Sequence, residues 1–81
     1  METKYDFIDK KQKLAKLIEK YLENKQNEPE LLKYIQELKK DDNFKNKQLF
    51  TNIFEEITKY LPELSNKELK QRILMINGFI D

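Results

Sequence analysis

The amino-acid sequence predicts an all-α fold, a small antiparallel three- or four-helix bundle in which residues 1–81 form a single helical domain. Apolar residues recur at the three- and four-residue spacing of an amphipathic helix in four separate segments. Polar or proline-containing stretches divide these segments, and the chain contains no Val, which strands favour, and only one Gly. Charged residues make up 38% of the chain, but four tyrosines and five phenylalanines supply a core and the net charge is only +1. The composition is therefore that of a folded domain.

The first helix is expected over residues 6–24, followed by a polar connector at 24–27. Its apolar stripe consists of Phe7, Leu14, Ile18, Tyr21 and Leu22. The second helix is expected over residues 28–40, because Asn27 is a favourable N-cap and Pro29 is tolerated in the first turn. Its stripe consists of Leu31, Ile35 and Leu38.

The third helix is expected over residues 46–61 and ends before Pro62, which cannot continue the hydrogen-bond pattern of a helix. Its apolar face is the broadest in the chain, so we expect this helix to be the one around which the others pack. The face consists of Leu49, Phe50, Ile53, Phe54, Ile57, Tyr60 and Leu61.

The fourth helix has the clearest start signal. Ser65 and Glu68 have the spacing of a capping box, and Leu64 and Leu69 have that of a hydrophobic staple around it. The helix is expected to end near residue 77, with Gly78 as the left-handed residue that follows many helices.

Catalytic chemistry is not expected from these residues. The chain has no Cys and no His, so it lacks a thiolate nucleophile, the commonest general base and the commonest metal ligand. Ser65 is expected to be occupied as a helix cap, and Glu19 and Glu23 are interpreted as part of a solvated charged face. The acidic loop at residues 41–45 does not match a calcium-binding loop, because Lys45 stands at a ligand position. We therefore expect no enzyme activity, no cofactor, no metal and no small-molecule substrate.

A nucleic-acid-binding regulator is the alternative interpretation. Basic and amide side chains gather early in the fourth helix, as in the recognition helix of a tri-helical DNA-binding domain, at Asn66, Lys67, Lys70, Gln71 and Arg72. Residues 50–72 resemble the last two helices of Myb-like domains, although the tryptophans typical of that family are missing. The small net charge and the even mixture of acids and bases argue against a phosphate-binding face.

The fourth helix carries more apolar residues than one packing face needs. Leu69, Ile73, Ile76 and Ile80 share one stripe. Leu74 and Met75 lie more than about 100° away from it, on opposite sides. Either the helix is buried on all sides, or a second face meets a partner. Phe79 adds apolar surface, and because Met suits adaptable contacts we predict Leu74, Met75 and Phe79 as partner-binding residues.

The function that follows is non-catalytic protein–protein interaction, with another protein or with a second copy in a homodimer. The abundance of Lys and Asn indicates an AT-rich bacterial or mobile-element genome. In size, short helices, Lys-rich surface and lack of Cys, the chain is similar to helical immunity or accessory proteins of Gram-positive bacteria, a likeness of composition that implies a regulatory, immunity or inhibitor-like role. Residues 1–9 lack an apolar signal core and the longest apolar run is residues 73–76, so we expect a cytoplasmic protein without membrane insertion.

Overall fold

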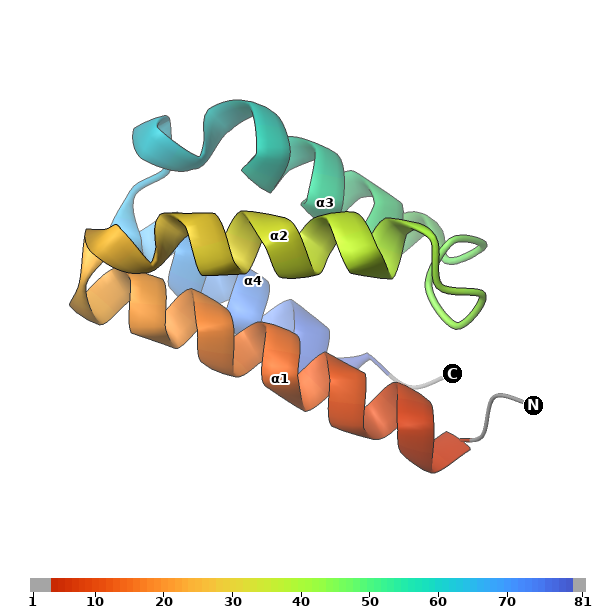
Figure 1. The fold of residues 1–81 in the computed structure, drawn as a ribbon. Coiled ribbons are helices and arrows are strands. Elements are labelled where there is room, and N and C mark those ends of the chain that lie inside the picture. The colour runs from red at the N-terminus through yellow and green to blue at the C-terminus, as the bar shows by residue number, and fades with distance from the viewer. Residues whose placement is uncertain (1–3, 80–81) are drawn as a thin grey trace.

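The computed structural model describes residues 4–79, which form four α-helices and no strand, so the prediction of an all-α antiparallel bundle is confirmed (Figure 1). Each helix lies within two residues of its expected start and end. The α-helices are α1 (Lys4–Glu23), α2 (Glu28–Lys39), α3 (Gln48–Tyr60) and α4 (Asn66–Gly78). Two short 3-10 helices follow α1 and α3, η1 (Lys25–Asn27) and η2 (Leu61–Glu63). No helix within this described part is long and apolar enough to cross a membrane.

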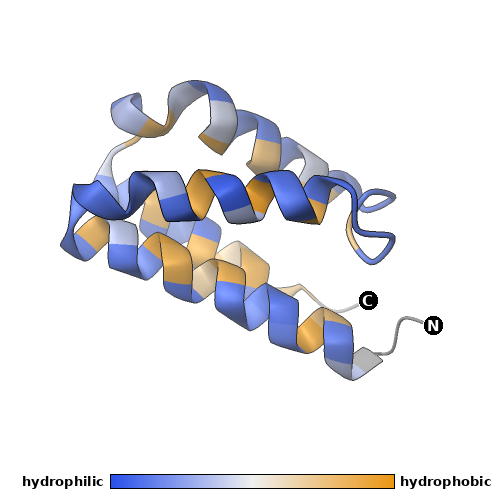
Figure 2. Ribbon diagram, viewed as in Figure 1, coloured by the Kyte–Doolittle hydropathy of each residue, from blue (hydrophilic) through white to orange (hydrophobic). Residues whose placement is uncertain are grey.

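The longest helix, α1, is the hub of the backbone packing. It approaches both α2 and α4 closely, whereas the main close helix neighbour of α3 is α2 (Figure 1). The expectation that the third helix would be the hub is therefore wrong. The reason is that α1 buries a wider face than its predicted stripe, since Ala15 and Leu17 are buried in addition. Apolar and charged residues alternate along α1 and α2, as amphipathic packing requires (Figure 2).

All five phenylalanines of the chain meet in one aromatic cluster. The Phe44 ring lies 5.0 Å from that of Phe7 and 4.9 Å from that of Phe50, measured between ring centroids. Phe50 also contacts Phe54 at 6.0 Å and Phe79 at 5.1 Å. The cluster thereby joins α1, the loop between α2 and α3, α3 itself and the residue that follows α4. Sequence analysis did not identify Phe44 as a core residue, because it stands in a polar loop.

The loop that holds Phe44 is clamped onto α1 by charged groups. The Lys10 ammonium binds the Asp6 carboxylate at 2.9 Å and also the Asp41 carboxylate. The bond to Asp41 is the largest cause of the raised pKa of Lys10, and the bond to Asp6 adds to it. Asn43 donates to Asp6 at 3.0 Å, and its own backbone N–H donates to the Asp41 side chain at 2.8 Å. The acidic loop is thus an interhelical clamp that keeps Phe44 fully buried.

The helix ends confirm one predicted cap and correct two others. Ser65 and Glu68 form the capping box in both directions. Asn27 stands at the N-cap of α2 but its side chain does not cap it, because Nδ2 instead donates to the carbonyl oxygen of Lys20 at 3.0 Å. Gly78 is the last residue of α4 and has no positive φ, so its expected role as a left-handed terminator is wrong.

Replacing Gly78 with Ala is expected to stabilise the protein by about 0.5 kcal/mol. Alanine restricts the unfolded chain more than glycine does and favours the helical conformation found here. A Cβ atom at this position would meet nothing within 4 Å. Urea unfolding followed by circular dichroism measures the difference. A loss of stability in G78A would mean that residue 78 adopts a left-handed conformation in solution.

Candidate interaction surface

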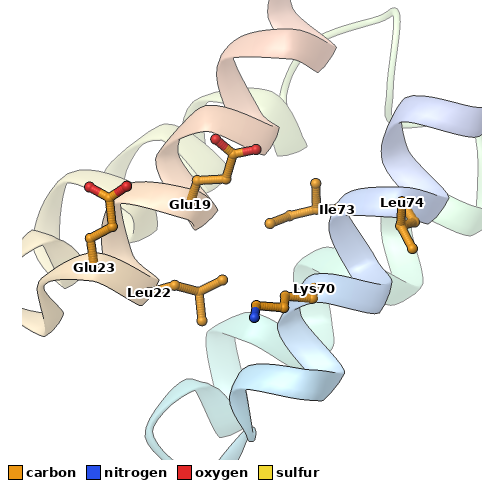
Figure 3. Close-up of a pocket in the computed structure, with 6 residues that line it drawn as sticks. All are labelled: Glu19, Leu22, Glu23, Lys70, Ile73 and Leu74. Atoms are coloured by element: carbon orange, nitrogen blue, oxygen red, sulfur yellow. The ribbon is translucent and has the colours of Figure 1, made fainter.

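An open groove of about 500 Å³ lies between the C-terminal half of α1 and α4 (Figure 3). It is lined by Glu19, Leu22, Glu23, Lys70, Ile73 and Leu74. Leu22 is half-buried and Ile73 is buried, and both extend into the space between the two helices (Figure 3). Leu74 is 71% exposed at the rim. The groove therefore has an apolar base with a large apolar side chain standing in solvent beside it.

The start of α4 and its buried face determine where Leu74 points. The Ser65 hydroxyl accepts the N–H of Glu68 at 3.1 Å, and the Glu68 carboxylate accepts the N–H of Ser65 at 3.2 Å. Leu69 and Ile76 are fully buried and define the inward face. Because each residue turns an α-helix by about 100°, Leu74 lies about 140° away from Leu69 around the axis. A single rigid helix therefore cannot bury both side chains on one side.

An ion pair fixes the other side of α4 against α3. Arg72 donates from Nε to Glu56 at 2.6 Å and from Nη2 to the second carboxylate oxygen at 2.9 Å. These bonds lower the pKa of Glu56 and raise that of Arg72, in each case against the opposing effect of burial. Two such bonds hold a planar guanidinium in one orientation. Since Leu74 follows Arg72 by about 200° of rotation, the pair keeps Leu74 away from α3 and on the α1 side.

The charged side chains of the groove are unpaired within the described residues. Glu19 and Glu23 stand on the α1 wall, and Lys70 extends from α4 towards Leu22 (Figure 3). All three charged residues are exposed, and no ion pair or hydrogen bond of their side chains occurs in residues 4–79. The groove thus offers an acidic wall and a basic wall with an apolar base between them.

The structure does not bring the three predicted partner-binding residues onto one surface. Leu74 stands at the α1–α4 groove, whereas Met75, 41% exposed, lies in a shallow cleft on the α3 side with Leu49 and Ile53. Phe79 is half-buried in the aromatic cluster. Leu74 and Met75 are thus exposed on two different sides of α4, so this helix is not buried all round. Ile80, predicted to share the inner stripe, lies outside the described residues.

The five predicted nucleic-acid contacts are also divided. Arg72 is held by Glu56, and Asn66 accepts a hydrogen bond from the Lys25 ammonium at 3.2 Å. Lys70 lines the groove that contains two glutamates. Lys70 itself, Lys67 and Gln71 are exposed side chains without a described partner. Their placement adds no support for a continuous basic face, and nucleic-acid binding remains an untested alternative.

Groups with shifted pKa values are candidates for catalytic acids and bases in general. Here Glu56, Arg72 and Lys10 are shifted chiefly by the structural ion pairs described above, and burial raises the pKa of Tyr21 and Tyr34. None of these groups lines the α1–α4 groove. Residues 4–79 contain no cluster of three or more potential metal ligands.

The sequence predicts the α4 half of the groove but not the α1 half, because Glu19 and Glu23 have the pattern of a solvated charged face and Leu22 that of the core stripe. The available signal was the position of Leu22 at the edge of that stripe, next to Glu23 and three residues after Glu19. Which helix faces that edge depends on tertiary packing, and one helix alone does not specify it.

Searches of protein-family models, curated proteins and solved structures find no match to this chain.

Replacing Glu56 with Gln is expected to lower the free energy of unfolding at pH 7 by about 0.5–1 kcal/mol, the range for a partly exposed ion pair. The folded state lowers the pKa of Glu56 below its ordinary value of 4.5. The stabilisation is therefore complete above that value and is lost as the pH falls through the lower, folded-state pKa. Urea unfolding of wild type and E56Q at pH 7 and at pH 3 measures it.

The difference between the two proteins should shrink at the lower pH. A difference that stays constant would show that Glu56 acts through its packing and not through its charge. Glu55→Gln is the matched control, because Glu55 is exposed and takes part in no ion pair within residues 4–79.

Proposed function

We propose that this protein is a non-catalytic protein–protein interaction module that binds its partner at the α1–α4 groove. The exposure of Leu74 carries the proposal. The inner face of α4 is already buried through Leu69, Ile73 and Ile76, so Leu74 contributes nothing further to the core. Fully burying a Leu side chain is worth about 1.5–3 kcal/mol, and that free energy is available to an intermolecular contact.

The groove suits an amphipathic helix as the bound element. Two helices with an apolar strip between them accept the apolar face of a third, which is a recurrent mode of recognition. Leu74 and Leu22 supply apolar contact, and the glutamates opposite Lys70 favour a ligand of complementary charge pattern. Burial of Leu74 determines affinity in this arrangement, while the exposed charges determine orientation and association rate.

A small regulatory, immunity or inhibitor-like protein of a bacterium or mobile element, acting in the cytoplasm, is the role we propose for such a module. The scaffold supports this role, because a small helical bundle presents a rigid helix face to another protein. Met75 forms a separate and adaptable contact on the α3 side, and Phe79 serves the aromatic cluster. The partner is another protein or a second copy of this chain.

Replacing Leu74 with Lys is expected to abolish partner capture while leaving the fold intact. The side chain is 71% exposed, so the charge costs little in the folded monomer but cannot be buried in an apolar contact. Immobilised wild type and L74K are compared by affinity capture from the native host, and circular dichroism checks that each is folded. Thr58→Lys, on the exposed face of α3, is the matched control.

The proposal requires that a protein retained by wild type and T58K be lost from L74K. Equal retention by all three proteins would show that the groove is not the binding surface.

A further inference from the structure

We infer that the partner bound at the α1–α4 groove is a second copy of this chain, related by a two-fold axis that runs along the groove. This inference rests on the proposed function, since it names the occupant of the same surface. In the arrangement each α4 lies over the partner subunit's α1. The two copies bury one another's exposed Leu74 side chains.

The α1 wall and the α4 wall of the groove have complementary shapes. A two-fold interface uses the same patch on both subunits, so that patch must contain both the element that inserts and the site that receives it. Leu74 is exposed on α4, while Leu22 and Ile73 point into the space between the two helices (Figure 3). Rotation about an axis along the groove exchanges the two walls. Leu74 then faces the α1 wall of the partner subunit.

The two walls also have complementary charges. The α1 wall carries Glu19 and Glu23, and the α4 wall carries Lys70, which extends towards Leu22 of the α1 wall (Figure 3). A two-fold axis parallel to the groove keeps each side chain at its own level along the groove and exchanges the walls. It therefore places Lys70 opposite the partner subunit's Glu19 and Glu23, and it does so twice in the dimer. The same side chains have no ion pair within the described residues of one chain.

The area that a weak dimer buries is small. Weak specific complexes bury less than about 600 Å² per partner. That is about one tenth of the 5548 Å² surface of the structure, so a dimer of this kind needs only a small part of it. Complexes of this size are weak, so the protein is expected to be a monomer when dilute and a dimer when concentrated.

Reversing the charges of the two groove walls tests whether the partner is a second copy of the chain and whether the two-fold axis runs along the groove. The full chain is studied by sedimentation equilibrium from about 10 µM to 1 mM at low salt, where exposed charges are least screened. Lys70→Glu places acid against acid in its own dimer, and the double variant Glu19→Lys with Glu23→Lys places base against base. Each variant alone is expected to dimerise at least about 10-fold more weakly than wild type. An equimolar mixture of the two is expected to form a heterodimer, because all facing charges are then opposite.

Lys59→Glu is the matched control, since Lys59 is exposed on α3 outside the groove, and it should dimerise as wild type does. Circular dichroism verifies that each variant is folded. A strictly monomeric wild type at 1 mM overturns the inference. A dimer that the charge changes weaken, but that the mixture does not restore, overturns the two-fold arrangement.

The inference and the proposed function can fail separately. If wild type is monomeric while L74K loses a captured protein that T58K retains, the groove binds a different protein and only the second-copy inference is wrong. If wild type dimerises but neither L74K nor the charge variants weaken the dimer, the contact lies elsewhere and the inference is again overturned.

Discussion

Packing of five phenylalanine rings in one cluster is the interaction on which the rest of the fold depends. The rings come from positions as distant in sequence as Phe7, Phe44 and Phe79, so they close the chain on itself at one end of the bundle. The Phe44 and Phe50 planes meet at 86° and those of Phe7 and Phe50 at 84°, the edge-to-face geometry that aromatic pairs favour. Each such pair adds about 0.5–1.5 kcal/mol beyond the burial of its area. A chain of this size has a thin core, and Phe7, Phe44, Phe50 and Phe54 of this cluster are buried in it.

Polar contacts then determine how the remaining elements sit on that core. The clamp of Lys10 with Asp6 and Asp41 holds the loop that delivers Phe44, and the pair of Arg72 with Glu56 holds α4 against α3. These contacts lie away from the α1–α4 groove. The ion pairs that hold the loop and α4 therefore involve none of the residues that line the proposed binding surface.

Helix periodicity and local end signals were sufficient to predict the fold class, the helix bounds and the capping box of α4. They are properties of short segments, and the sequence shows them directly. The buried state of Phe44 was not predictable in this way, because it depends on contacts with α1 and α3 brought together only by folding. The hub was misjudged for a similar reason, since the width of an apolar stripe does not reveal which helices approach most closely. Within the groove, the exposure of Leu74 could be predicted from its position around the helix. The position of Glu19 and Leu22 in the same groove could not, because it depends on how α1 packs against α4.

The central claim is that Leu74 is not part of the core of the folded chain. The most direct measurement compares the free energies of unfolding of Leu74→Ala and Leu69→Ala with that of wild type, by urea denaturation at a concentration low enough to keep the protein monomeric. Leu69 is fully buried, so its truncation is expected to cost about 2–5 kcal/mol. Truncation of Leu74 is expected to change the stability by no more than about 0.5 kcal/mol. A loss at Leu74 as large as that at Leu69 would place this side chain in the core and contradict the account.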